Sequence, residues 1–193
     1  MIVAIEGGDQ AGKKTQTAML AKALRRQNIK TATFSFPDYR TPIGKEISRH
    51  LARGIKSTPQ VIHCLMAANR WEKLDKITNA ASNHSVVIMN RYYHSNLVYG
   101  TVNGLKPGWL ENLERGLPKT DLVILLDMPA RESFHRKKIN RDRFETNEAF
   151  LEGIMKTYRT VAKRRHWKII DASQSRQKTH QDIIKLVSKK LGT

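Results

Sequence analysis

Acidic residues, cysteines and long apolar runs are scarce in this sequence of 193 residues. Aspartate and glutamate number 17 against 35 lysines and arginines, which leaves a formal net charge of +18. Such an excess favours polyanionic partners: nucleic acid, an acidic membrane surface or phosphorylated small molecules. The single cysteine, Cys64, excludes an internal disulfide and is consistent with a reducing cytosol.

The longest apolar runs, such as Leu122–Leu126, are too short to span a bilayer. The chain begins directly with a strand-like apolar stretch and has no basic segment before it, so we expect no signal peptide. These features predict a soluble cytoplasmic protein with one domain over residues 1–193.

Periodicity predicts an alternation of strands and helices. Short apolar runs typical of buried strands are Ile2–Ile5, Thr31–Phe36, Val86–Met89, Leu122–Leu126 and Lys168–Ile170. Stretches with helical spacing lie between or after them, at Lys13–Gln27, Pro59–Ala81, Glu148–Lys163 and Gln177–Leu191. Thr58 and Pro59 are typical of a helix start, with a hydroxyl cap before a proline. The alternation predicts an α/β fold with a parallel sheet covered on both faces.

The segment EGGDQAGKKTQ, from Glu6 to Gln16, is similar to the phosphate-binding pattern G-x-x-x-x-G-K-[ST]. Gly7, Gly12 and Lys13 fit the pattern, but Lys14 stands where the Mg²⁺-binding hydroxyl is expected. Because the loop lies between a predicted strand and a predicted helix, its N–H groups are expected to face an anion at a helix N-terminus. The alternative is a glycine turn that opens an ordinary basic helix.

Ordered segments along nearly the whole chain resemble the thymidylate kinase family. They are GGDQAGKKTQ, FPDYRTPIGKEI, AANRWEKLDKI, NRYYHSNLVYG, GLPKTDLVILLD, DRFETNEAF and IDASQSRQKTHQDI. The resemblance implies a P-loop kinase fold with a central five-stranded parallel sheet and a short basic lid over residues 136–146. It also implies phosphoryl transfer from ATP to dTMP, which gives dTDP and ADP, with Mg²⁺ as cofactor and a homodimer as the assembly.

The resemblance assigns an ATP site and a catalytic set. Residues expected at ATP are Gly7, Gly8, Gln10, Ala11, Gly12, Lys13, Lys14, Thr15, Gln16, Ala172 and Ser173. Residues expected to be catalytic are Lys13, Arg91, Arg136, Arg141 and Arg143. Lys13 is expected to reach the β- and γ-phosphates. Some family members have a catalytic arginine at the loop position of Gln10, so the lid arginines are expected to stabilise the transferring phosphoryl group here.

The resemblance also assigns a dTMP site, with Asp9, Phe36, Pro37, Arg40, Met66, Asn69, Arg70, Arg91, Ser95, Asn96 and Tyr99. Arg70 is expected to bind a thymine carbonyl, since its guanidinium has fixed, forked donors. Met66 occupies the place of a phenylalanine that often stacks on the base, although periodicity alone more often indicates a core residue. Arg40 is expected to bind the dTMP phosphate, one position after Tyr39; the alternative is an exposed loop arginine.

Metal binding is expected to be unusual, because Lys14 replaces a hydroxyl and Asn90 replaces a carboxylate of the family pattern. No direct ligand is assigned, and the candidates are Asn90 and Asp127. We hypothesise that Lys14 partly replaces the electrostatic role of Mg²⁺, while phosphates and waters hold the ion.

Two other functions remain open at this point. One is a degenerate homologue that binds nucleotides and turns over slowly. The other is a nucleic-acid-binding protein, although no RNP-like aromatic motif or zinc spacing accompanies the positive charge. The composition predicts at most weak, salt-sensitive binding to nucleic acid.

Overall fold

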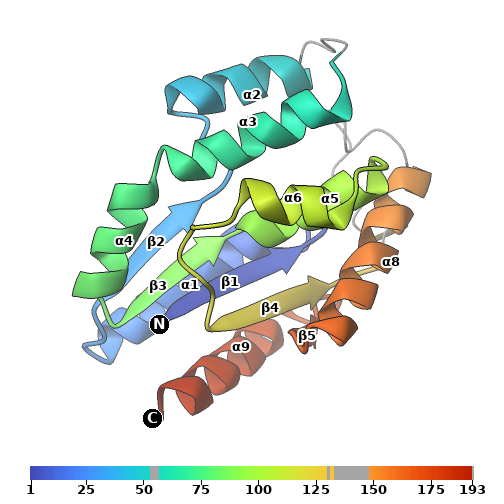
Figure 1. Ribbon diagram of the computed structural model, residues 1–193. Coiled ribbons are helices and arrows are strands. Elements are labelled where there is room, and N and C mark those ends of the chain that lie inside the picture. Colours follow the sequence, from blue (N-terminus) through green and yellow to red (C-terminus); the bar gives the residue numbers. More distant parts are fainter. Residues whose placement is uncertain (53–56, 130, 133–147, 193) are drawn as a thin grey trace.

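The computed structural model describes residues 1–52, 57–129, 131–132 and 148–192. Its sheet consists of β1 (Ile2–Gly7), β2 (Thr31–Ser35), β3 (Val86–Asn90), β4 (Leu122–Asp127) and β5 (Lys168–Asp171). The strand order is β2-β3-β1-β4-β5 and every neighbouring pair is parallel (Figure 1). The predicted parallel sheet is therefore confirmed. The predicted lid, residues 136–146, lies outside the described residues.

Helices cover both faces of this sheet (Figure 1). They are α1 (Lys13–Arg26), α2 (Pro42–Ala52), α3 (Pro59–Trp71), α4 (Leu74–Asn83), α5 (Tyr93–Val102), α6 (Pro107–Leu113), α8 (Glu148–Arg164) and α9 (Arg176–Leu191). Side chains of β1 alternate between two cores: Val3 and Ile5 pack with α1 and α9, whereas Ile2 and Ala4 pack with α4. All of β1 is buried, as expected for a central parallel strand.

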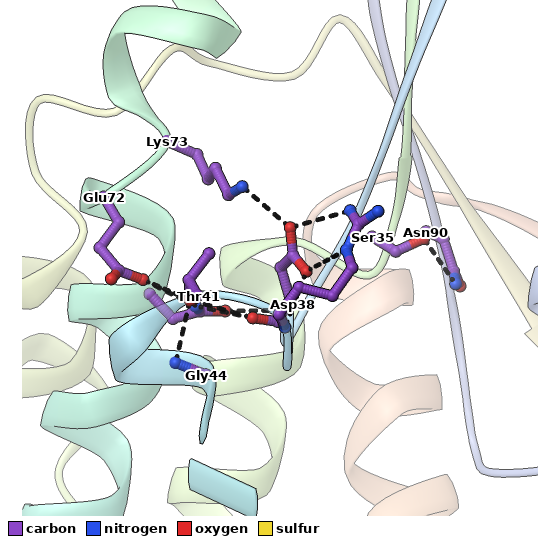
Figure 2. Close-up of polar contacts among 9 residues, drawn as sticks. Ser35, Asp38, Thr41, Gly44, Glu72, Lys73 and Asn90 are labelled. Carbon is purple, nitrogen blue, oxygen red and sulfur yellow. Dashed lines mark hydrogen bonds and ion pairs between the residues drawn. The ribbon is translucent and has the colours of Figure 1, made fainter. Parts of the chain in front are cut away.

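The prediction of one helix over Pro59–Ala81 was wrong, because the chain leaves helical geometry at Lys73 and divides the stretch into α3 and α4. Tertiary contacts of the two residues between these helices account for the break (Figure 2). The Glu72 carboxylate accepts hydrogen bonds from the Thr41 hydroxyl (2.7 Å) and the Ile43 N–H (3.2 Å). Lys73 Nζ lies 2.9 Å from the Asp38 carboxylate. The loop after β2 therefore decides where α3 ends.

Prolines mark the first turns of several helices. Pro59 opens α3 as predicted, although the Thr58 side chain makes no capping hydrogen bond. Helices α2 and α6 were not predicted, and both begin at a proline, Pro42 and Pro107. Proline is favoured at that position because it needs no backbone hydrogen-bond donor there. No helix in the described ranges has both the length and the apolar character needed to cross a bilayer.

Candidate active site

The loop between β1 and α1 has the geometry of a phosphate-binding loop. Gly7 adopts φ +147°, and a Cβ there would lie 2.6 Å from the carbonyl oxygen of Leu126, so only glycine fits. Gly12 is left-handed and precedes the first turn of α1. Lys13 is buried, and its ammonium group donates a 2.5 Å hydrogen bond to the Gly8 carbonyl across the loop. The predicted order of strand, glycine loop and helix is thus confirmed.

The next residues of α1 differ in exposure. Lys14 and Thr15 are exposed at the N-terminus of the helix, where donors and dipole favour an anion. Gln16 is buried and its Nε2 donates to the carbonyl of Arg176 at the start of α9 (3.0 Å). Gln16 therefore joins α1 to α9 rather than facing outward from the loop.

A pocket opens beside this loop and encloses about 560 Å³ of free space, part of it open to solvent. It is lined by Asp9, Phe36, Pro37, Tyr39, Leu51, His63, Met66, Arg70, Arg91, Tyr92, Ser95, Asn96 and Tyr99. Most residues predicted for dTMP therefore lie together on its walls, and Asp9 belongs to both the pocket and the loop. The walls combine an apolar part with the cations of Arg70 and Arg91.

Arg91 is the central cation at the end of the pocket next to the loop. Its Nη2 lies 2.5 Å from Asp9 Oδ1, and the Tyr99 hydroxyl donates to the other Asp9 oxygen (3.1 Å). Burial raises the pKa of Asp9, but the positive charges of Arg91 and Lys13 and the hydrogen bonds from Arg91 and Tyr99 outweigh it and lower that pKa. Asp9 is therefore an anion held between the loop lysine and Arg91.

Behind Arg91 lies Glu6, a carboxylate with no exposed surface on β1. It accepts hydrogen bonds from the Ser95 hydroxyl (2.6 Å), the Tyr158 hydroxyl (3.0 Å) and the Tyr92 N–H (2.8 Å). Both hydroxyls also contact Arg91 Nη1, at 3.0 and 3.3 Å. Burial alone would raise the pKa of Glu6, whereas His94, Arg91 and Ser95 together lower it. Glu6 thus holds Arg91 through two hydroxyl groups.

Arg70 and Asn96 form another part of the wall. Arg70 on α3 donates from Nε to Glu114 Oε2 (2.9 Å), and its Nη2 donates to Glu114 Oε1. Asn96 on α5 donates to the same carboxylate from Nδ2 (2.8 Å). All three residues are buried. Buried groups held in this way present fixed hydrogen-bonding atoms to a ligand.

Asn90 ends β3 beside β1 and is one of several described residues with a buried side-chain oxygen that accepts no hydrogen bond. Its Nδ2 donates to the Ser35 hydroxyl (3.2 Å; Figure 2), whereas its buried Oδ1 has no hydrogen-bond partner among the described residues. An amide oxygen is a suitable ligand for Mg²⁺ or its waters. Within the described ranges, no group of three or more His, Cys, Asp or Glu side chains is arranged to hold a metal. The Asn90 amide oxygen is therefore a candidate contact for the ion or its waters.

Comparison with known proteins agrees with this geometry. The family profile described as thymidylate kinase matches residues 5–183. Thymidylate kinase of Schizosaccharomyces pombe is 34% identical over 192 residues, which cover 97% of this chain and 91% of that protein. The human thymidylate kinase is 31% identical and covers 94% of this chain and 87% of its own length. This chain belongs to the thymidylate kinase family.

A solved structure supports the same family. The thymidylate kinase of Candida albicans matches with a TM-score of 0.86 and 25% sequence identity, covering 98% of this chain and 92% of the other. The α/β P-loop kinase fold expected from the sequence is confirmed. The family assignment also confirms the resemblance on which the site residues were assigned, although each residue's role stays a prediction.

Two residues predicted for dTMP lie outside the pocket lining of this thymidylate kinase family member. The side chain of Arg40 is 90% exposed and pairs with Asp38 through Nε (2.8 Å) and Nη2 (3.0 Å). This partner holds Arg40 on the loop, while its neighbour Tyr39 lines the pocket. Asn69 is fully buried and supports the same loop: its Oδ1 accepts from the Asp38 N–H (2.7 Å) and its Nδ2 donates to the Thr41 hydroxyl (2.8 Å).

The loop after β2 packs closely enough against α2 to require glycine in the first turn of that helix. A Cβ on Gly44 would lie 1.8 Å from the carbonyl oxygen of Asp38, and the Gly44 N–H donates to the Thr41 hydroxyl at 3.0 Å. The hydrogen bonds from Arg40 and Lys73 hold the pKa of Asp38 well below its usual range. Asp38 thus stays ionised and keeps the loop beside the pocket.

Three further predicted residues lie at the carboxyl ends of β4 and β5: Asp127, Ala172 and Ser173. Ala172 is buried, with its N–H on the Asp127 carbonyl (2.7 Å), and Ser173 donates from backbone and hydroxyl to Asp171. Arg159 Nε donates to both oxygens of the Asp127 carboxylate, at 3.0 and 2.9 Å. Asp127 therefore already has a cation as its partner. Arg136, Arg141 and Arg143 lie outside the described residues.

Sequence reasoning missed His63 and Glu114. His63 precedes Met66 and Arg70 on α3 by three and seven positions, so helical spacing placed it on the same face and could have identified it. Glu114 follows the unpredicted helix α6, and no local pattern indicates its contact with an arginine 44 positions earlier. Only the packing of α3, α5 and α6 brings these residues together.

Proposed function

We propose that this protein transfers the γ-phosphoryl group of ATP to dTMP, giving dTDP and ADP in deoxythymidine nucleotide synthesis. The observation that carries the proposal is the position of Asp9, which belongs to the phosphate-binding loop and also lines the pocket. ATP phosphates on the loop and a nucleotide in the pocket would therefore meet at Asp9 and Arg91. Membership of the thymidylate kinase family supports dTMP as the nucleotide in the pocket.

Lys13 and Arg91 supply the positive charge for this reaction. Lys13 leaves the Gly8 carbonyl to bind the β- and γ-phosphates of ATP, and Arg91 stabilises charge on the transferring group. Asp9 keeps Arg91 in place and accepts a hydrogen bond from the sugar hydroxyl of dTMP. Mg²⁺ would neutralise phosphate charge when bound, and Asn90 Oδ1, which has no hydrogen-bond partner among the described residues, would hold the ion or its waters.

The base of dTMP lies on the pocket wall that Arg70 and Asn96 form, with Met66 against its ring. Arg70 donates to the C4 carbonyl of thymine, and Asn96 accepts from the N3 hydrogen. Phe36, Pro37 and Tyr99 complete the surroundings of the nucleotide. The Arg40 and Asp38 side chains form an ion pair in this structure. Arg40 can therefore bind the dTMP phosphate only if this ion pair breaks.

A coupled assay tests this function. Purified protein is supplied with ATP, Mg²⁺ and one nucleoside monophosphate at a time, and ADP formation is measured. We expect dTMP to be the best acceptor and dUMP the second. Faster phosphorylation of dCMP, AMP or GMP would show that the acceptor is wrong, and absence of turnover with firm dTMP binding would favour the degenerate homologue.

Lys14 and Asn90 are expected to act as a matched pair in metal binding. Lys14→Ser removes an ammonium group without supplying a carboxylate, and Asn90→Asp adds a carboxylate while the ammonium group of Lys14 remains. Only the double variant creates the usual hydroxyl and carboxylate around Mg²⁺. We expect a non-additive cycle in kcat/KM, with a coupling of about 1 kcal/mol or more, and a steeper Mg²⁺ dependence in the double variant.

Calorimetry of ADP binding at several Mg²⁺ concentrations gives a readout that is independent of turnover. A stronger effect of Mg²⁺ on ADP affinity in the double variant than in either single variant supports the pairing. Additive changes in kcat/KM together with an unaltered Mg²⁺ response would leave Lys14 as an incidental substitution.

The homodimer implied by the family has a candidate interface on α3. Val61 and Trp71 are among the exposed large apolar residues, with exposed fractions of 43% and 36%, and Cys64 is exposed between them. With Ala68, these positions recur at helical spacing and form one apolar stripe. A second copy of the chain that packs on this stripe removes it from water.

Charge on the stripe is expected to dissociate the dimer. Val61→Asp should convert the dimer to monomer in light scattering at micromolar concentration, because the dimer would bury an unpaired carboxylate. Ile169→Asp is the matched control, since Ile169 has a similar exposed fraction of 42% on β5. Dissociation by the Ile169 variant alone would place the interface on the other side of the molecule.

Location in the cytoplasm is supported by the single, exposed cysteine and by the phosphorylated substrates. The net charge of +18 supports weak, salt-sensitive binding to nucleic acid as a side property. No feature of the described site favours nucleic acid as the main ligand.

A further inference from the structure

A buried network of hydrogen bonds lies behind the pocket wall, and Glu114 is at its centre. Glu114 does not line the pocket. Its carboxylate binds Arg70 Nε at 2.9 Å and Asn96 Nδ2 at 2.8 Å, and it is 8% exposed. Because little water reaches these groups, each must obtain its hydrogen bonds from the others. Glu114 therefore determines how both wall residues are turned.

The contacts of Asn96 allow one orientation of its amide. Nδ2 is 2.8 Å from Glu114 Oε1 and 3.2 Å from the carbonyl oxygen of His63, and both of these atoms only accept hydrogen bonds. A flipped amide would place its oxygen against two other oxygens. Asn96 Oδ1 consequently faces His63 Nδ1, at 2.7 Å, and keeps a second lone pair for a ligand.

His63 supports the same orientation from the other side. Its Nε2 is 3.0 Å from Asn103 Nδ2, an atom that only donates, so Nε2 accepts and Nδ1 carries the proton. Burial lowers the pKa of His63, which keeps the ring neutral near pH 7. The His63 Nδ1–H therefore donates to Asn96 Oδ1, in agreement with the amide orientation that Glu114 requires.

We infer that Glu114 is a positioning residue that fixes a donor of Arg70 beside an acceptor of Asn96, and so selects a pyrimidine with a carbonyl at C4. The inference rests on the proposed function. Glu114 engages Nε and Nη2 of Arg70, which leaves Nη1 as the remaining nitrogen of the guanidinium. Thymine and uracil offer an acceptor at C4 and a hydrogen on N3. Cytosine offers a donor at C4 and an acceptor at N3, so both contacts fail.

Glu114→Gln tests the inference. The carboxylate accepts hydrogen bonds with both of its oxygens, whereas an amide accepts only with its single oxygen and donates with its nitrogen. The ratio of kcat/KM for dTMP to that for dCMP is expected to fall at least tenfold. Most of the change should be a higher KM for dTMP, with kcat and the KM for ATP nearly unchanged. Glu111→Gln is the matched control: Glu111 lies on α6, is exposed and pairs with Arg165, so the ratio should change less than twofold.

The outcomes separate the inference from the proposed function. If the natural protein does not prefer dTMP over dCMP, the proposed function itself is wrong. If it does, and folded Glu114→Gln retains that preference, the inference is overturned. Should Glu114→Gln not fold, the ratio is measured for Glu114→Asp, which keeps the charge but is one methylene shorter. A fall of about threefold or more supports the inference, and full retention of the preference overturns it.

Discussion

Arg91→Ala is expected to lower kcat for dTMP phosphorylation roughly a thousandfold, the effect typical of an arginine that stabilises a transferring phosphoryl group. The KM for ATP should change little, because ATP phosphates bind mainly to the loop around Lys13. The substitution also removes the cation that pairs with Asp9. Glu6 normally holds this cation in place through the hydroxyls of Ser95 and Tyr158. Steady-state kinetics with dTMP and ATP varied in turn measure both effects.

Arg49→Ala is the control for loss of an arginine. Arg49 is exposed on α2 and pairs with Glu46, so its removal should leave kcat within twofold. Arg91→Lys keeps the charge but cannot contact Asp9 and both hydroxyls together, and we expect an intermediate kcat. A folded Arg91→Ala protein with more than a tenth of the natural kcat would remove Arg91 from the catalytic set.

Arg70→Met should affect both stability and dTMP use. The exposed fraction of the Arg70 side chain is 3%, so its removal leaves the Glu114 carboxylate buried without its cation. Breaking a buried pair in this way costs about 3–5 kcal/mol of unfolding free energy. Loss of one charged hydrogen bond to the base should lower kcat/KM for dTMP at least tenfold, since such bonds contribute about 1.5–3 kcal/mol. Urea denaturation and steady-state kinetics measure the two changes separately.

A double variant distinguishes the two roles of Arg70. Arg70→Met with Glu114→Gln removes both charges, and the amide oxygen introduced by the second substitution can still accept from Asn96. We expect most of the unfolding free energy to return, because neutral replacement of a buried pair is often tolerated. The kcat/KM for dTMP should stay low. If kcat/KM recovers together with stability, Arg70 has a structural role and does not contact dTMP.

The sheet and the phosphate-binding loop could be predicted from the sequence because their signals are local. The apolar runs of β1 and β4 are uninterrupted since both faces of these strands are buried. Gly7, Gly12 and Lys13 are close together in the chain, so their spacing shows the loop directly. The pocket residues came from the family resemblance, and Asp9, Arg70 and Arg91 do lie on its walls.

Features that depend on contacts between distant segments could not be predicted. Asp38 and Lys73 end α3 earlier than periodicity indicates, and Asp38 also keeps Arg40 on the loop outside the pocket lining. Glu114 joins α3 and α5 only because α6 packs against both of them. The Asp38–Lys73 and Arg70–Glu114 pairs join residues that are far apart in the chain, and neither spacing nor composition indicates these partners.

The buried acids also determine where the net charge acts. Glu6, Asp38 and Glu114 each lie beside cations of the interior or of the pocket wall, so those regions are close to neutral. Among the described residues, many cations are exposed, such as Arg25 and Arg26 on α1 and Lys189 and Lys190 on α9. A field of this kind speeds the arrival of anions and is screened by salt within about 10 Å at 0.1 M. Ionic strength should therefore change the association rate of nucleotides with this protein and leave their relative affinities almost unchanged.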